Sequence, residues 1–390
     1  MNEKKTPEEA GDNRSFRVTT RVMFCILVCV FSAVSSLNPL GVLGLPLAVA
    51  AGAMLSMLAL SFGDSSAKTA ALFAMVLLPY AASAVILRSP VLALAALFPA
   101  VLAFPIWLTV RSGSGRFGSI AAATAASAVL WGVYIALSIR TEYGALTLET
   151  VRQMIDETFL PAEEMLGKLT FEKNGEIISM YTEEEIGAML AQIKSLLIGS
   201  AVSALWVISY LTTLVARLIG SVFDVTALLP RSVRVIVRRR LTADGPQVEV
   251  SHDTVIWRIE PDVVTAGVYL AGYLLSVLFM PKSGVLPFTA AMQNLVVILT
   301  PTFIYVGGRD FIDSLRGKAP MFLGCATPIS VIVRLFINPL MLVMLLAFIG
   351  VMSVFRENLT RRSASAQNGG KGPDKGQDDS DHTNDPDDPE

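Results

Sequence analysis

Four polar residues within long apolar stretches of the chain are its best candidates for binding chemistry. Arg334 is the one basic residue deep inside such a stretch, and Asn338 follows it one helical turn later. Gln293 and Asn294 are adjacent amides early in another apolar stretch. An arginine at the centre of a bilayer costs about 2.5–3.5 kcal/mol, so it has to pair, reach the interface or line water. We therefore interpret Arg334, Gln293, Asn294 and Asn338 as candidate substrate-binding residues.

Each candidate also has a structural interpretation. Arg334 fits a side chain that extends to the membrane surface, or one at a helix break where Pro339 follows. Amides such as Gln293 and Asn294 commonly form hydrogen bonds between membrane helices. The sequence leaves both interpretations open.

Patterns typical of catalysis or metal binding are missing from the sequence. Neither HExxH nor GxSxG occurs, and the two histidines, His252 and His382, lie in polar segments. Cys25 and Cys29 are four apart in an apolar stretch, where packing is the simplest role. Gly307-Gly308-Arg309-Asp310 lacks the preceding strand and the lysine of a phosphate-binding loop, so it predicts a surface loop with an Arg–Asp pair. We expect no enzyme, no cofactor and no metal site.

Composition indicates where these residues lie. Of 390 residues, 53% are hydrophobic and 16% are charged, and the mean hydropathy is +0.57. A soluble domain has roughly 25% charged residues. The apolar residues also form blocks of about 20, the length that crosses about 30 Å of hydrocarbon. The sequence thus excludes a soluble enzyme, a fibrous protein and a disordered chain. It predicts an all-α transmembrane bundle of about 8–10 spans.

The blocks and the polar segments between them divide the chain into five parts. A disordered arm (1–20) precedes a first transmembrane half (21–140), in which Pro46, Pro79 and Pro105 interrupt spans. A polar segment (141–194) leads to a second transmembrane half (195–355). Its final apolar stretch, Pro320–Phe355, is too long for one upright span and short for two. The Gly-, Asp- and Pro-rich end (356–390) predicts a disordered acidic tail.

The polar segment 141–194 predicts helical structure outside the membrane. Leu148, Val151, Ile155 and Phe159 have helical spacing, which indicates an amphipathic helix before Pro161. Thr182 and Glu185 have the spacing of a capping box, and the helix they begin is expected to run into the next span. Such a segment is a candidate surface for a protein partner.

A basic loop spans residues 220–260. Arginines crowd residues 231–240, and alternating apolar residues around a turn at Asp244-Gly245-Pro246 predict a short β-hairpin. A basic run beside a span usually anchors the cytoplasmic side, and contact with anionic lipid or a protein partner is the alternative. It does not indicate nucleic-acid binding.

Lys and Arg residues also predict orientation. With the N-terminus in the cytoplasm, 18 of them fall inside and 7 outside, before the final stretch is placed. We therefore expect a multi-pass protein of a bacterial plasma membrane, with segment 141–194 outside. The final stretch leaves the side of the C-terminal tail open, and a re-entrant turn at Arg334 and Asn338 would place it inside.

Several short motifs occur in a fixed order: Pro90 with an apolar block that ends at Arg111, Trp257-Arg258-Ile259-Glu260-Pro261 before a span, Asn294-Leu295 within a span, Gly307-Gly308 after it, and a last span from Gly350 to Arg356. This order, over most of residues 20–360, resembles the YybS-like family of uncharacterised bacterial membrane proteins. The family's usual Gln-Gly pair is Val306-Gly307 here, and the acidic tail is not a family feature. The resemblance implies a polytopic bundle whose first half is likened to substrate-binding components of vitamin transporters.

Two function classes follow from these patterns. Kinked spans and the polar candidates favour a transporter-like or small-molecule-binding membrane component. The amphipathic outer segment and the basic loop favour a non-catalytic envelope scaffold that binds protein partners. Both place the chain in a lipid bilayer.

Overall fold

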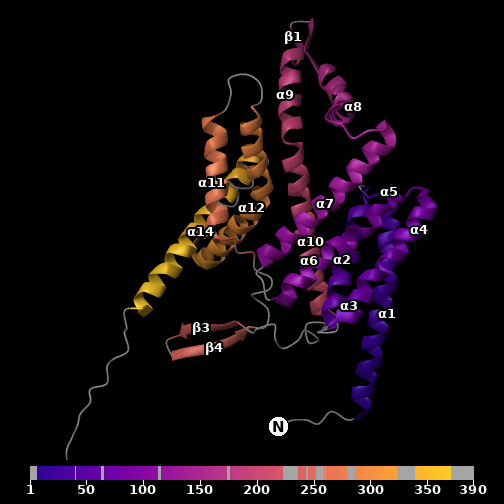
Figure 1. Ribbon diagram of the computed structural model, residues 1–390. Helices are drawn as coiled ribbons and strands as arrows, with labels where there is room; N and C mark the ends of the chain where they lie inside the picture. Colours follow the sequence, from indigo (N-terminus) through magenta and orange to yellow (C-terminus); the bar gives the residue numbers. More distant parts are fainter. Residues whose placement is uncertain are drawn as a thin grey trace, which may run out of the picture.

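The architecture of the chain is an assembly of long helices (Figure 1), seen in a computed structural model. The structure describes residues 7–39, 41–62, 66–112, 116–173, 176–222, 236–242, 245–251, 259, 261–279, 286–322 and 339–369. Eight of the helical segments in these ranges are long and apolar enough to cross a membrane. The chain is therefore a multi-pass membrane protein built as an all-α bundle.

The first half forms one group of packed helices. It contains α1 (Pro7–Leu37), α2 (Gly44–Ser61), α3 (Ser66–Met75), α4 (Leu77–Leu87), α5 (Pro90–Ala93), a 3₁₀ turn η1 (Leu94–Leu97), α6 (Phe98–Ser112) and α7 (Arg116–Tyr143). Helix α2 is its centre, because 67% of its apolar window is buried against 22–50% in the other candidate spans. Helices α1, α6 and α10 (Leu197–Val222) surround it.

Small side chains let these helices approach closely. Gly52 on α2 has the backbone of Pro99 and the side chain of Thr212 within 3.3 Å of where its Cβ would be. Ala51, Ala53 and Ala59 on the same helix are fully buried. In lipid, helices associate by such close packing. Lipid tails are as apolar as the helix side chains, so the hydrophobic effect does not drive two helices together.

The prolines have three different positions in these helices. Pro46 lies in the first turn of α2, where its missing N–H costs nothing, so the predicted interruption there is wrong. Pro79 follows a break at Val76 that divides the predicted span into α3 and α4. Pro105 lies inside α6, where its carbonyl accepts a 2.7 Å hydrogen bond from Thr109 Oγ1.

A second group contains α11 (Val263–Leu278), α12 (Pro287–Phe322) and α14 (Pro339–Gly369), and α12 joins it to α10. Tyr269, Phe303 and Val351 are central to its apolar core. Helix α12 continues past Gly307 and Gly308, where a loop was expected, so Arg309 and Asp310 are helical. Helix α14 extends to Gly369, into the segment for which the sequence predicts a disordered tail, and residues 370–390 lie outside the described ranges.

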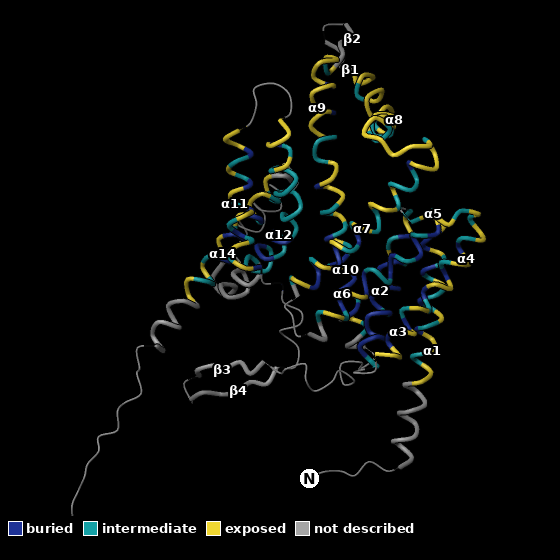
Figure 2. The backbone as a smooth tube through the Cα atoms, viewed as in Figure 1, coloured by how far each residue is buried: buried dark blue, intermediate teal, exposed yellow. Residues whose placement is uncertain are grey.

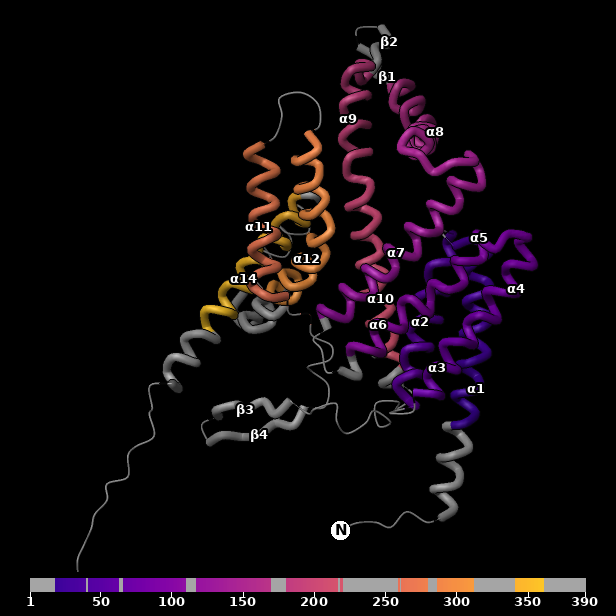
Figure 3. The backbone as a smooth tube through the Cα atoms, in the orientation of Figure 1, coloured from indigo at the N-terminus to yellow at the C-terminus, as the bar shows by residue number. Residues whose placement is uncertain are grey.

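Helices α12 and α14 run in the same direction (Figure 3). A Cβ on Gly307 would overlap the carbonyl of Leu346, and a Cβ on Gly350 would overlap the carbonyl of Phe303. Because every Cβ leans toward the N-terminus of its own helix, this reciprocal pattern requires two parallel helices with the glycines opposite each other. The C-terminal end of α14 thus lies at the same end of the assembly as α1's beginning (Figure 1).

Two smaller segments connect the helices. At one end, α8 (Leu148–Gly167), the strands β1 (Thr170–Lys173) and β2 (Glu176–Ser179), and α9 (Glu183–Ser195) project beyond the bundle (Figure 1). At the other end, β3 (Ile236–Thr242) pairs antiparallel with β4 (Gly245–Ser251). The predicted end of α8 before Pro161 is wrong, since the helix passes through that proline in an exposed segment where water can satisfy the freed carbonyl.

Exposed residues follow the candidate spans along the outside of the bundle (Figure 2), and many of them are large and apolar. Val85 and Ile86 on α4 are 78% and 64% exposed, and Val129 on α7 is 67% exposed. The buried polar residues are mostly serines and threonines; for example, Ser36 donates a 2.6 Å hydrogen bond to Ser83 between α1 and α4. Apolar residues outside and small, hydrogen-bonded polar residues inside are the arrangement that a lipid environment requires.

Candidate functional site

Asn294 lies where α12 crosses the junction between α9 and α10. Its Oδ1 accepts a 2.5 Å hydrogen bond from Gly199 N, and its Nδ2 donates to Ser195 O at 2.6 Å and to Ala290 O at 2.7 Å. Helix α9 ends at Ser195 and α10 begins at Leu197. The amide therefore satisfies a free carbonyl at the end of one helix and a free N–H at the start of the next.

The same junction explains the glycine at position 199. A Cβ there would come within 2.9 Å of the Cα of Asn294 and 3.0 Å of its carbonyl oxygen. Gly199 thus allows the backbones of α10 and α12 to touch, which brings the Asn294 amide into reach. This geometry agrees with the structural interpretation of Asn294, because all three hydrogen bonds go to backbone groups.

Of the other three candidate binding residues, the structure describes only Gln293. Gln293 is half-buried and makes no hydrogen bond within the described ranges, so its amide is open to another partner. Arg334 and Asn338 lie outside the described residues, between α12 and α14. Of the four candidates, the structure therefore describes only Gln293 and Asn294.

A polar cluster lies at the C-terminal end of the α12–α14 contact; it contains the predicted Arg309–Asp310 pair and two residues of α14 that the sequence patterns did not connect with it. Asp310 on α12 accepts a hydrogen bond from the Ser353 hydroxyl on α14. Its two carboxylate oxygens also face guanidinium nitrogens, Arg309 Nη2 at 3.3 Å and Arg356 Nη2 at 3.4 Å. The Asp310 side chain is only 17% exposed, so one partly buried carboxylate faces two arginines.

One signal in the sequence could have identified this cluster. Asp310 follows Gly307 by three residues, and Ser353 follows Gly350 by three. Residues three apart share a helix face, so a parallel contact between the glycines places Asp310 beside Ser353. Two consecutive glycines predict a loop instead, and the parallel direction of the helices has no local signature.

The outer segment 141–194 is held together by polar contacts between its helices. Lys194 on α9 forms a 2.5 Å ion pair with Asp156 on α8 and lies 5.8 Å from the ring centroid of Phe159. The Tyr143 hydroxyl donates a 2.7 Å hydrogen bond to Glu157, which helps lower the pKa of that carboxyl. Helix α8 buries none of its residues, and apolar side chains such as Leu148 and Met165 are 69% and 68% exposed.

The predicted capping box at the start of α9 is confirmed. Thr182 Oγ1 accepts from Glu185 N at 3.3 Å, and Glu185 Oε2 accepts from Thr182 N at 2.8 Å. Hydrogen bonds from the backbone and side chain of Thr182 lower the pKa of Glu185. Asp262 caps α11 in a similar way, and its pKa is lowered by hydrogen bonds from the side chain and backbone of Thr265.

The basic loop is described only in part. Residues 231–235 lie outside the described ranges, whereas Arg238, Arg239 and Arg240 are on β3, opposite Glu249, Val248 and Gln247. Among the residues that the structure describes, no group of three or more His, Cys, Asp or Glu side chains could hold a metal ion, and Cys25 and Cys29 are free thiols.

No protein-family model matches the chain, and comparisons with curated proteins and with solved structures gave no match.

Proposed function

We propose that this protein is a small-molecule-binding membrane component of the kind that serves transport. The observation that carries this proposal is the parallel contact between α12 and α14 at Gly307 and Gly350. Two helices that are consecutive spans of a simple bundle would be antiparallel. A parallel pair is typical of folds in which a broken or re-entrant element turns inside the membrane, and such elements form solute sites in transporters.

The depth of α14 supports the same proposal. Pro287 precedes Gly307 by 20 residues, and Pro339 precedes Gly350 by 11 residues. At about 1.5 Å of rise per residue, the first residue of α14 is about 14 Å closer to the glycine contact than the first residue of α12. The N-terminus of α14 therefore lies within the depth of the bundle, where the positive end of the helix dipole favours an anion.

Polar residues for such a site are found just before α14 in the sequence and on α12. Arg334 and Asn338 directly precede α14, and Gln293 has an amide free of hydrogen bonds within the described ranges. Asn294 is better explained as a structural bridge, so we remove it from the substrate-binding set. The proposed ligand is a small anionic solute.

Arg334→Gln tests this proposal, with Arg88→Gln as control, an exposed arginine at the end of α4. The purified full chain in detergent is screened against small carboxylates and phosphate esters by thermal shift. We expect at least one compound to stabilise the parent chain and the Arg88→Gln variant, but not Arg334→Gln. Compounds that stabilise all three proteins equally, or none of them, would contradict the proposal.

A second candidate function is that of an envelope scaffold. It is favoured by the projecting unit of α8, β1, β2 and α9, whose two helices are tied by the Asp156–Lys194 ion pair and which keeps apolar side chains exposed. Purification from membranes in mild detergent separates the two functions. ATPase subunits of a transporter in the eluate would support solute binding, whereas cell-wall or division proteins would support the scaffold.

The proposed setting is a bacterial plasma membrane with the N-terminus in the cytoplasm. Support comes from the excess of Lys and Arg predicted on that side and from the likeness to the YybS-like family. In this orientation the unit formed by α8 and α9 faces the outside, and the arginines of β3 face the cytoplasm.

A further inference from the structure

The cluster at the end of the α12–α14 contact carries more positive than negative charge. Asp310 is the one carboxylate that Arg309 and Arg356 contact within the described ranges. Its Oδ2 also accepts a hydrogen bond from the Ser353 hydroxyl. One carboxylate therefore balances two guanidinium groups, and a positive charge is left over.

The two arginines also have N–H donors that make no hydrogen bond within the described part of the chain. Nε and Nη1 of Arg309 are buried and have no partner within the described part of the chain. Leaving such donors unpaired costs about 1–3 kcal/mol for each group. The Arg356 side chain is 78% exposed and holds Asp310 only by one long contact of 3.4 Å, so most of its five N–H donors are open.

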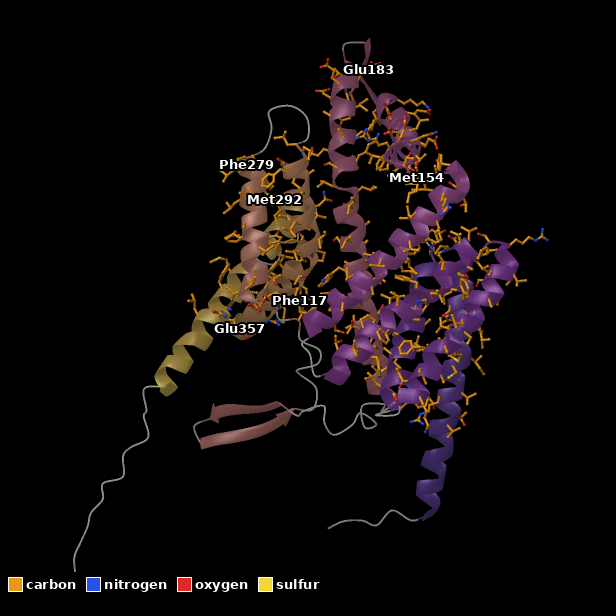
Figure 4. All side chains as sticks on the ribbon, in the orientation of Figure 1. Phe117, Met154, Glu183, Phe279, Met292 and Glu357 are labelled. Carbon is orange, nitrogen blue, oxygen red and sulfur yellow. The ribbon has the colours of Figure 1, made fainter. Side chains whose placement is uncertain are left out.

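The cluster lies at the depth where lipid headgroups are found. Charged residues replace the apolar run of α12 at Arg309 and Asp310, and that of α14 at Arg356 and Glu357, so the cluster lies where both apolar stretches end. Glu357, next to Arg356, lies at the opposite end of the assembly from Glu183 (Figure 4). Residues 309–318 and 356–362 together contain six basic and three acidic residues, so the surrounding sequence is positive as well.

We propose that Arg309 and Arg356 bind a phosphate group here, that of an anionic phospholipid headgroup. A guanidinium presents a planar pair of N–H donors that matches two phosphate oxygens. Basic pockets between membrane helices near the cytoplasmic surface bind anionic headgroups in this way. Asp310 and Ser353 are positioning residues, because they hold the two arginines together across the α12–α14 contact.

Native mass spectrometry of the full chain in mild detergent tests the proposal. The protein is titrated with phosphatidylglycerol and, separately, with phosphatidylcholine, which has a phosphate but no net charge. We expect phosphatidylglycerol to bind about tenfold more tightly than phosphatidylcholine. Arg356→Gln should reduce this preference about tenfold, while Lys68→Gln, which removes an exposed cation near the start of α3, should leave it unchanged.

Several outcomes would overturn the proposal. Equal retention of both lipids would show that charge is not recognised, and equal loss in Arg356→Gln and Lys68→Gln would indicate a general surface effect. Arg309→Gln provides a second test, but Arg356 is exposed, so its variant stays informative even if Arg309→Gln fails to fold. Inorganic phosphate at millimolar concentration is included as a competitor. If it displaces phosphatidylglycerol completely, the site binds a soluble phosphate and the lipid assignment is wrong.

Discussion

Gly307 of α12 and Gly350 of α14 lie directly opposite each other, so close that neither position has room for a Cβ atom. Their contact fixes the parallel direction of the two helices and brings Asp310 to Ser353 one turn later. The backbone contact thus determines both the topology of the second helix group and the position of its polar cluster.

Replacing Gly350 by Ala should destabilise the protein by about 1–3 kcal/mol, because the added methyl group would force the two helices apart. The change is measured as a lower midpoint of thermal unfolding in detergent. Gly308→Ala is the matched control, since its Cβ would meet nothing within 4 Å. Alanine is also the better helix former, so this variant should be as stable as the parent or slightly more stable. Equal effects at the two positions would refute the close contact.

The bridge at Asn294 gives a second prediction. Asn294→Ala should lower stability by about 1–3 kcal/mol, because it leaves Gly199 N and Ser195 O without their partner at a junction between helices. Gln293→Ala should change stability by less than about 0.5 kcal/mol, since this half-buried amide has no hydrogen bond to lose within the described ranges. Thermal unfolding of both variants is the measurement. If Gln293→Ala were the more destabilising variant, the assignment of the two amides would have to be reversed.

The membrane location of most of the chain was the property most readily predicted from the sequence. Blocks of about 20 apolar residues and a low share of charge predict membrane helices, and the capping box at Thr182 needed only its own spacing. Helix ends were less predictable. Pro161 and Gly307-Gly308 are typical of breaks, yet α8 and α12 continue through them, because tertiary packing and water supply what the local sequence lacks.

The candidate site was predictable only in part, because its geometry depends on long-range contacts. Asn294 was identified as a polar residue within a span, but its role depends on the break at Leu196, which lies about a hundred residues earlier. Likewise, Asp310 and Ser353 are 43 residues apart and meet only because α12 and α14 are parallel. No local pattern encodes that direction.

The capping box at Thr182 predicts a pH dependence of α9. The pKa of Glu185 is lowered from 4.5 in the folded chain, so its contribution to helix stability is present above that value and is lost as pH falls through the folded pKa. Hydrogen exchange of the first amides of α9 should therefore show protection that declines below about pH 4.5. Glu185→Gln is the control, because glutamine keeps the capping box without titrating. A variant that loses protection over the same pH range as the parent would show that another group is responsible.

The parallel contact of α12 and α14 also predicts which segments share one side of the membrane. Lys68 at the start of α3 and Leu359 near the end of the α14 span are exposed, and they should be on the same side, opposite Glu183 of α9. Single cysteines test this arrangement after Cys25, Cys29 and Cys325 are replaced. In sealed vesicles, a membrane-impermeant maleimide should label Lys68→Cys and Leu359→Cys together, and Glu183→Cys only from the other side. An antiparallel α14 would instead group Leu359→Cys with Glu183→Cys, and the re-entrant interpretation would then fail with it.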